Sequence, residues 1–237
     1  MTPKELQQAS AELGLDLTAA QLDQFKAYYD LLVAWNEKMN LTAITDQGEV
    51  YLKHFYDSLT LVAAYPLAGH LRLVDVGSGA GFPSVPLKIA CPDLEVTIVD
   101  SLKKRLTFLD ALVKELGLTG VSLHHARAED FGRNKKYRGQ FDLVTARAVA
   151  RLSVLAEYCL PLAQKGGTFI AMKGSQGQEE LLEAKHAIAT LGGKVAGVKT
   201  LELPGEEGQR EMIVIQKTKE TPNKYPRKAG TPHKKPL

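Results

Sequence analysis

Cysteine is scarce in this chain, which holds only Cys91 and Cys159 among its 237 residues. No Cys or His pair has the spacing of a zinc site, so neither a disulfide framework nor a bound metal is expected. Long apolar runs are also missing: no stretch of about 18 apolar residues occurs, so no membrane span is expected. The first residues are polar and lack the apolar region of a secretory signal, so we expect a cytoplasmic protein.

An excess of one charge occurs only at the C-terminal end. The whole chain carries 30 Lys and Arg against 27 Asp and Glu, a net charge of +3. Residues 217–237 hold seven of these basic residues and one acid, Glu220, so that segment alone carries +6. A basic segment that also contains four prolines is not expected to form a packed core. It would serve either as an arm that contacts RNA phosphates or as a solvated tail, and its charge alone leaves both open.

The first 65 residues show the three- and four-residue spacing of amphipathic helices. An apolar stripe over residues 22–39 follows a capping-box pattern. A second helix is predicted over Val50–Ala64, and Pro66 follows its end. We therefore expect residues 1–66 to form an N-terminal helical extension.

From Leu71 onward, short apolar runs alternate with helical stretches, and this order predicts an α/β fold. We expect a mostly parallel seven-stranded sheet with helices on both faces, in one domain over residues 67–217, followed by a basic tail over residues 218–237. The strands are predicted over Leu71–Val76, Leu94–Val99, Val121–His125, Phe141–Ala146, Gly167–Met172 and an antiparallel pair, Lys194–Leu203 and Glu211–Lys217. The helices between them are predicted over Val85–Ala90, Lys103–Leu116, Ser153–Leu160 and Gln178–Leu191.

A glycine-rich turn follows the first predicted strand and precedes a predicted helix. It contains Gly77, Gly79 and Gly81, in the pattern G-x-G-x-G. Glycines in this context let the backbone turn sharply and let a ligand approach the main chain beyond the strand ends. A dinucleotide fingerprint would need glycine at position 82, where this chain has Phe82, and no P-loop pattern is present.

Two acidic residues narrow the choice of ligand. Asp75 precedes the turn, where a carboxylate disfavours a pyrophosphate and suits a ligand with an ammonium or sulfonium group. Asp100 ends the second strand, where an acid accepts hydrogen bonds from both hydroxyls of an adenosyl ribose. This combination resembles motifs I and II of class I S-adenosylmethionine-dependent methyltransferases, which have a Rossmann-like fold. The alternative is a purely structural turn, with Asp100 as a helix cap.

Motifs from residue 20 to the end of the chain are similar to those of the RsmG (GidB) family. They are Trp35–Thr42, His54–Leu59, Val74–Pro83, Asp100–Ser101 with Lys104, Arg105, Phe108 and Leu109, Ala126–Glu129, Thr145–Ala148, Met172–Gly174 and Lys224–Pro232. The resemblance implies an enzyme that uses S-adenosylmethionine to methylate N7 of a guanine in the 530 loop of bacterial 16S rRNA. Its substrate would be 16S rRNA or the small ribosomal subunit, and we expect a monomer that does not associate with membranes.

The resemblance also implies which residues hold the cofactor. The family's cofactor contacts correspond here to Gly77, Phe82, Arg147 and the Ala128–Glu129 pair. Phe82 would form a wall of the cofactor site unless it belongs to the core. Ala128 and Glu129 follow the third strand, where class I enzymes contact adenine, but Glu129 could instead be a solvated acid or begin a helix. With Gly79 and Asp100 from the residue pattern, the predicted cofactor-binding residues are Gly77, Gly79, Phe82, Asp100, Ala128, Glu129 and Arg147.

Arg147 ends an apolar strand at the edge of the expected crevice. Its guanidinium group could bind the cofactor carboxylate, guanine O6 or a phosphate. It could also form a surface ion pair with Asp142 or Glu129. Lys173, at the end of the next strand, is a similar candidate with an alternative role as an edge residue whose amine reaches solvent.

No dedicated catalytic acid or base is expected, because guanine N7 carries a lone pair and no proton. His54, Tyr56 and Asp57 have helical spacing, which favours a packed helix over an acid–base role. His124 and His125 lack a third metal ligand. RNA contacts are expected from the tail and from Lys103, Lys104, Arg105, Arg127, Arg133, Lys135, Lys136 and Arg138.

Two other functions remain open from the residues alone. One is an RNA-binding scaffold that holds an adenosine cofactor without catalysis. The other is a nucleotide-dependent oxidoreductase, which Phe82 disfavours because the dinucleotide fingerprint has glycine there.

Overall fold

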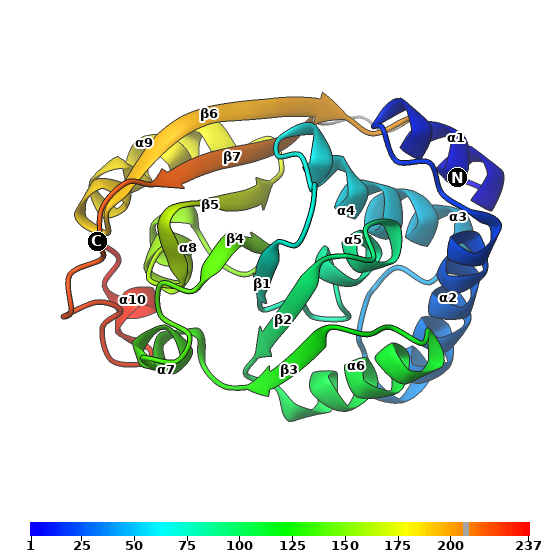
Figure 1. The fold of residues 1–237 in the computed structure, drawn as a ribbon, viewed down its shortest axis with the longest axis horizontal. Helices are drawn as coiled ribbons and strands as arrows, with labels where there is room; N and C mark the ends of the chain where they lie inside the picture. Colours follow the sequence, from blue (N-terminus) through cyan, green and yellow to red (C-terminus); the bar gives the residue numbers. More distant parts are fainter. Residues whose placement is uncertain (206–208) are drawn as a thin grey trace.

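The computed structural model describes residues 1–205 and 209–237; residues 206–208, inside the predicted 67–217 domain, lie outside the described part. A seven-stranded sheet with the strand order β3-β2-β1-β4-β5-β7-β6 forms the centre of the molecule (Figure 1). Neighbouring strands run parallel except that β7 is antiparallel to both β5 and β6. These findings confirm the α/β class and the antiparallel last pair. The strands span Arg72–Val76 (β1), Glu95–Asp100 (β2), Val121–His125 (β3), Phe141–Arg147 (β4), Ala163–Lys173 (β5), Gly193–Glu202 (β6) and Gln209–Lys217 (β7).

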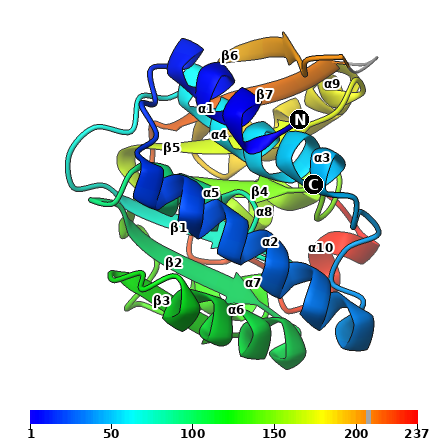
Figure 2. The ribbon, with the colours of Figure 1, turned by 90° about the vertical axis from the view of Figure 1, so that its right-hand side faces the viewer.

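Helices cover both faces of the sheet (Figures 1 and 2). One face carries α1 (Pro3–Glu12), α2 (Ala19–Met39), α3 (Gln47–Val50), α4 (Asp57–Leu59), α5 (Ser84–Ala90) and α6 (Lys103–Glu115). The other face carries α7 (Ala128–Arg133), α8 (Leu152–Cys159), α9 (Gly177–Thr190) and α10 (Thr231–Lys234). Each face has its own hydrophobic cluster, and the central strand β1 is buried along its whole length except at Arg72. None of the described helices is long and apolar enough to cross a membrane.

The N-terminal helices form part of the same core as α5 and α6. The capping box predicted before α2 is present: Thr18 Oγ1 accepts a hydrogen bond from Gln21 N at 3.3 Å, and Gln21 Oε1 accepts one from Thr18 N at 2.8 Å. The inward face of α2 then places Phe25, Tyr28 and Leu32 in the core without solvent exposure. The helix α2 therefore packs against α5 and α6, and the Tyr28 hydroxyl group donates a hydrogen bond to the Ala80 carbonyl oxygen in the glycine-rich turn at 2.5 Å.

The single helix predicted over Val50–Ala64 is wrong. The chain forms α3, a π-helical stretch over Tyr51–Tyr56, the short helix α4 and a 3-10 turn over Thr60–Ala63. A π-helical stretch admits one extra residue per turn and so changes which side chains face the same direction. The periodicity of apolar residues cannot show this insertion, because it tests only for a regular helical repeat.

The C-terminal segment, residues 218–237, is packed against the protein rather than solvated. Thr221, Tyr225 and Pro226 are buried, and α10 contacts α8. The expectation that this segment does not pack was wrong, because polar groups of the domain bind its backbone. Arg138 donates hydrogen bonds to the carbonyl oxygens of Thr221 and Tyr225, both at 2.7 Å.

Candidate functional site

The glycine-rich turn between β1 and α5 adopts backbone conformations that L side chains rarely adopt. Gly77, Gly79 and Gly81 have φ angles of 75°, 62° and 102°. A Cβ on Gly77 would lie 2.8 Å from Val149 Cγ2, and one on Gly81 would lie 2.7 Å from the Tyr28 hydroxyl oxygen. A Cβ on Gly79 would meet no atom within 4 Å. The turn is therefore packed tightly at its ends and presents open backbone in its middle.

Asp75 lies beneath this turn and is fully buried. Its Oδ2 accepts a hydrogen bond from Ser84 N at 3.2 Å, at the start of α5. Burial raises the pKa of Asp75 to about 7, and hydrogen bonding from Ser84 offsets part of that effect. Asp75 does not line any of the three pockets described below. The sequence predicted that its carboxylate faces a cationic ligand, but in the structure the carboxylate supports the start of α5.

The largest of three neighbouring pockets lies beyond the ends of β1 and β2 and has a volume of about 530 Å³. Its lining includes Gly77, Asp100, Ala128 and Glu129. Asp100 is 3% exposed; its Oδ1 accepts a hydrogen bond from Leu102 N at 2.8 Å, and its Oδ2 lies 3.3 Å from a terminal nitrogen of Arg105. Leu102 occupies the N-cap position of α6, so Asp100 is not the helix cap that the alternative interpretation required.

Glu129 lies in the first turn of α7 and is 3% exposed, so it begins a helix and is not a solvated acid. Its Oε1 accepts a hydrogen bond from Gly230 N at 2.7 Å. Gly230, His233 and Lys234 line the same pocket. The C-terminal segment, expected to contact only RNA or solvent, thus forms one side of the largest pocket.

Phe82 belongs to the core and to the site at once. It is 5% exposed, and its ring stacks on Tyr28 and His54 with centroid separations of 5.4 and 4.5 Å. The Arg147 guanidinium carbon lies 5.0 Å from the centre of the Phe82 ring, within the range of a cation–π contact. Phe82 also lines a second pocket of about 180 Å³, together with Gly77 and the other residues of the glycine-rich turn up to Ala80.

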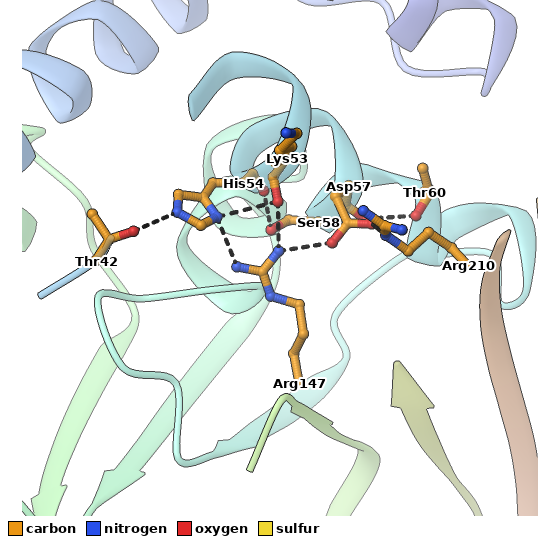
Figure 3. Close-up of polar contacts among 8 residues, drawn as sticks. All are labelled: Thr42, Lys53, His54, Asp57, Ser58, Thr60, Arg147 and Arg210. Atoms are coloured by element: carbon orange, nitrogen blue, oxygen red, sulfur yellow. Dashed lines mark hydrogen bonds and ion pairs between the residues drawn. The ribbon is translucent and has the colours of Figure 1, made fainter. Parts of the chain in front are cut away.

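Arg147 points from the end of β4 toward the N-terminal helices (Figure 3). One terminal nitrogen lies 2.8 Å from Asp57 Oδ2 and 3.1 Å from the Lys53 carbonyl oxygen, and the other lies 3.3 Å from His54 Nδ1. The predicted alternative, a surface ion pair with Asp142 or Glu129, is therefore wrong. Asp57 is shared with a second arginine, since its Oδ1 accepts a hydrogen bond from Arg210 Nε at 3.1 Å.

His54 packs as predicted, but it also lines two pockets. Its Nε2 lies 2.8 Å from the Thr42 hydroxyl oxygen. Burial, together with the positive charge of Arg147, lowers the pKa of His54 to about 4. The imidazole is therefore neutral at neutral pH, with both nitrogens in polar contacts.

A third pocket, of about 350 Å³, lies between the N-terminal helices and the ends of β5 and β7. Met172 and Met212 supply apolar walls, and Arg147, Asp57 and Arg210 supply charged groups. All three pockets share Ala148, the first and second share Gly77, and the second and third share Arg147 and His54. The three pockets are thus consecutive parts of one groove.

Comparisons with known proteins show the family of this chain. The family model described as "GidB: rRNA small subunit methyltransferase G" matches residues 21–213. The chain belongs to this family. The Ribosomal RNA small subunit methyltransferase G proteins of Listeria welshimeri and Lactobacillus johnsonii are 58% and 59% identical to it over 237 and 239 residues, with 100% of each chain covered. The protein is therefore an S-adenosylmethionine-dependent methyltransferase of ribosomal RNA.

Solved structures of other methyltransferases show the same fold. TrmN from Thermus thermophilus matches with a TM-score of 0.53 and 17% identity over 68% of this chain and 48% of its own. A variant of the 16S rRNA (adenine(1408)-N(1))-methyltransferase from Catenulisporales acidiphilia, solved with its cosubstrate SAM, also has a TM-score of 0.53 and 17% identity, over 68% of this chain and 91% of its own. The class I methyltransferase fold predicted from the sequence is thereby confirmed.

The groove fits the cofactor of this family. The first pocket has a volume typical of small-molecule sites, and the carboxylate of Asp100 lines it while nearly excluded from water. The open space at Gly79 leaves room for a ligand against the turn. Within the described residues, no cluster of three or more His, Cys, Asp or Glu side chains is placed to bind a metal.

The basic residues expected to contact RNA differ in how far other parts of the protein already hold them. Arg133 and Arg138 are engaged by the C-terminal segment: Arg133 Nε donates a hydrogen bond to the Pro226 carbonyl oxygen at 2.8 Å. Arg105 pairs with Asp100 inside the groove. Lys103, Lys104, Arg127, Arg133, Lys135 and Lys136 are exposed.

Lys173 is not an edge residue that reaches solvent. Its side chain is 10% exposed, its Nζ lies 2.7 Å from Glu180 Oε2, and it donates a hydrogen bond to the Ala150 carbonyl oxygen at 2.6 Å. Arg210 is a groove residue that the sequence analysis missed. Its position, two residues into the last strand, carries no local signal, because strand ends often hold a charged residue.

Proposed function

We propose that this enzyme transfers a methyl group from S-adenosylmethionine to N7 of a guanine in the 530 loop of 16S rRNA. It acts in the cytoplasm, as a monomer, on 16S rRNA or the small ribosomal subunit. Residues 67–217 form the methyltransferase domain, which the N-terminal extension over residues 1–66 and the segment over residues 218–237 complete on either side.

The continuity of the three pockets carries this proposal. A methyltransferase must place a cofactor and an acceptor base in contact, with the donor sulfur, the methyl carbon and the acceptor nitrogen in line. The first pocket accommodates the adenosine part of the cofactor beside Asp100, and the second accommodates its methionine part beside the glycine-rich turn. The third pocket meets the second at Arg147 and is then the place for the base.

Each predicted cofactor residue has a role in this arrangement. Asp100 accepts hydrogen bonds from the ribose hydroxyls, and the backbone at Ala128 and Glu129 faces the adenine. Gly77 and Gly79 give the methionine part access to the main chain. Phe82 forms a wall of the cofactor site, and Arg147 binds the carboxylate of the cofactor.

The bound cofactor supplies an electrophilic methyl group on a sulfonium sulfur. Guanine N7 attacks through a lone pair in the plane of the ring, so no proton has to be removed. The groups around the junction agree with this chemistry. His54 has a pKa lowered to about 4, which makes it a weak base, and Asp57 holds Arg147 and Arg210 in place.

Arg210 is suited to distinguish guanine from adenine. Both bases offer N7 as an acceptor, but guanine has the acceptor O6 beside it where adenine has an amino group. Arg210 uses only its Nε on Asp57, and its terminal nitrogens hold no hydrogen bond within the part of the chain that the structure describes. A donor next to N7 therefore favours guanine and opposes adenine.

Mapping the modified base tests the proposal. Purified protein and a labelled methyl donor are added to unmodified 16S rRNA and to small subunits, and N7-methylguanine is located by chemical cleavage at the modified base. Label at a guanine of the 530 loop is the expected result. Label at another position, or at an exocyclic amine, would contradict the proposal.

A pair of variants tests the base pocket. Arg210→Gln should reduce methylation of the RNA while cofactor affinity stays within about twofold of wild type, because Arg210 lies away from the first two pockets. Arg72→Gln is the matched control, since Arg72 lies at the opposite end of β1 and pairs with Asp142 at the surface. Equal activity of both variants would remove Arg210 from the site.

A further inference from the structure

The C-terminal segment over residues 218–237 lies outside the residues matched by the family model, which end at 213. Its sequence is that of a basic tail, yet the structure gives it a defined path along the face that carries α7 and α8 (Figure 1). Three of its residues, Gly230, His233 and Lys234, line the 530 Å³ pocket that also contains Asp100. A segment without an assigned role therefore borders the adenosine end of the groove.

Two buried acids of the domain hold the segment in place. Glu157 is 1% exposed and accepts hydrogen bonds from Arg227 N at 2.6 Å and from a terminal nitrogen of Arg227 at 2.7 Å. Glu129 is 3% exposed and binds Gly230 N at 2.7 Å. A buried carboxylate is costly unless it is paired or hydrogen-bonded, so the domain requires these contacts from the segment.

The beginning of the segment is anchored just as firmly. Lys217 is 1% exposed and donates hydrogen bonds to Thr221 Oγ1 at 2.5 Å and to the Leu160 carbonyl oxygen. Burial lowers the pKa of Lys217 to about 8. Arg138 holds the carbonyl oxygens of Thr221 and Tyr225. The path from β7 to Gly230 is therefore set by side chains of the domain, which place the start of α10 beside the pocket.

We propose that residues 230–237 form the outer wall of the adenosine pocket and that Lys234 is a cofactor-binding residue of this enzyme. Adenine offers ring nitrogens as acceptors at its edge, and the Lys234 ammonium group and the His233 ring are the donors that this wall supplies. Glu129 has a positioning role: it holds Gly230, and through it the wall, against the pocket. The proposal concerns cofactor binding alone and does not depend on which base of the RNA is methylated.

Truncation after Ala229 is the direct test, with binding measured by calorimetry in the absence of RNA. The probes are S-adenosylmethionine and adenosine. Loss of the wall should weaken both by about tenfold or more, since several contacts to the adenosine part disappear together. Far-ultraviolet circular dichroism and the urea midpoint report whether the truncated protein is folded. A folded truncated protein with wild-type affinity would overturn the proposal.

Two adjacent lysines provide a test that does not disturb the fold. Lys234 lines the pocket, whereas Lys235 does not, and both are exposed. Lys234→Ala should weaken adenosine binding by about threefold or more, and Lys235→Ala should leave it within about twofold, although both remove one positive charge. Equal affinities for the two variants would exclude Lys234 as a cofactor contact. If the truncated protein fails to fold, this pair decides the question.

The positioning role of Glu129 is tested separately. Glu129→Gln keeps an acceptor for Gly230 N, whereas Glu129→Ala removes it. Cofactor affinity should fall for Glu129→Ala and should be largely restored in Glu129→Gln. Trypsin should also cleave after Lys228 and Lys234 faster in Glu129→Ala than in wild type. Unchanged cleavage would show that Glu129 does not hold the segment.

Discussion

Asp75 should make the stability of this protein fall as the pH rises from 5 to 8. Its carboxyl group is fully buried, Oδ2 accepts one hydrogen bond from Ser84 N, and Oδ1 has no partner within the described residues. Burial raises its pKa from 3.8 to about 7. Between these two pH values the folded protein holds a proton on Asp75 that the unfolded chain has lost. The stabilisation that comes from this bound proton is fully present below pH 3.8 and is lost as the pH rises to about 7.

The size of the effect follows from the pKa difference. Each pH unit within the window changes the free energy of unfolding by about 1.4 kcal/mol, so the interval from pH 5 to 7 corresponds to about 3 kcal/mol. Asp75→Asn removes the titrating group and keeps an oxygen that can accept the hydrogen bond from Ser84 N. The difference in stability between the variant and the wild type should therefore shift by about 3 kcal/mol in favour of the variant between pH 5 and pH 8.

Urea denaturation of both proteins at several pH values measures this shift. Because the two proteins share all other titrating groups, the contributions of those groups to the pH dependence of stability cancel in the difference. Asp110→Asn is a matched control, because Asp110 is an exposed residue of α6 and its side chain is 58% exposed. Parallel stability curves for Asp75→Asn and wild type would refute the reasoning and would show that Asp75 is ionised in the folded protein.

Other predictions concern the groups around the groove and its turn. Arg147→Ala should lower the free energy of unfolding, measured by urea denaturation, by about 3 kcal/mol, because it leaves the buried Asp57 with one partner. The control Arg72→Ala breaks a surface ion pair and should lower it by less than about 1 kcal/mol. His54 has a pKa lowered to about 4 from 6.5, so the stability it contributes is present above pH 6.5 and is lost as the pH falls toward 4. His54→Gln should flatten the acid limb of the wild-type stability curve by up to about 3 kcal/mol. Gly81→Ala should lower the free energy of unfolding by about 3 kcal/mol, because the added Cβ would lie 2.7 Å from the Tyr28 hydroxyl oxygen. Its control Gly139→Ala places a Cβ in open space and should lower the same free energy by about 1 kcal/mol.

The sheet and the turn were predictable because their signals are local. Apolar runs bounded by glycine and charged residues mark the strands, and the strand–turn–helix context makes the glycine pattern informative. The positive φ angles of Gly77, Gly79 and Gly81 agree with that interpretation. The position of Asp100 at the end of β2 follows from the strand itself, since its side chain must lie at the crevice edge.

The contacts that complete the groove were not predictable in the same way. Arg147 binds Asp57 across 90 residues of sequence, and Glu129 binds Gly230 across 101. The partners are three charged residues and one backbone N–H group, and nothing near them in the sequence indicates a distant counterpart. Charge counting then assigned the C-terminal segment to solvent or RNA. It cannot reveal that Arg227 neutralises a buried acid, because burial of Glu157 is a property of the folded state.

The same long-range pairs suggest how the groove is assembled. The acids Asp57, Glu129 and Glu157 are each at most 5% exposed, so each would be costly to bury alone. Their partners come from β4 and β7 for Asp57 and from the C-terminal segment for the other two. Asp57 is therefore paired only when the N-terminal helices lie against β4 and β7, and Glu129 and Glu157 gain their partners only when the last residues are in place. Both ends of the chain close the groove, and loss of either end should loosen cofactor and base pockets through charges left unpaired in the interior.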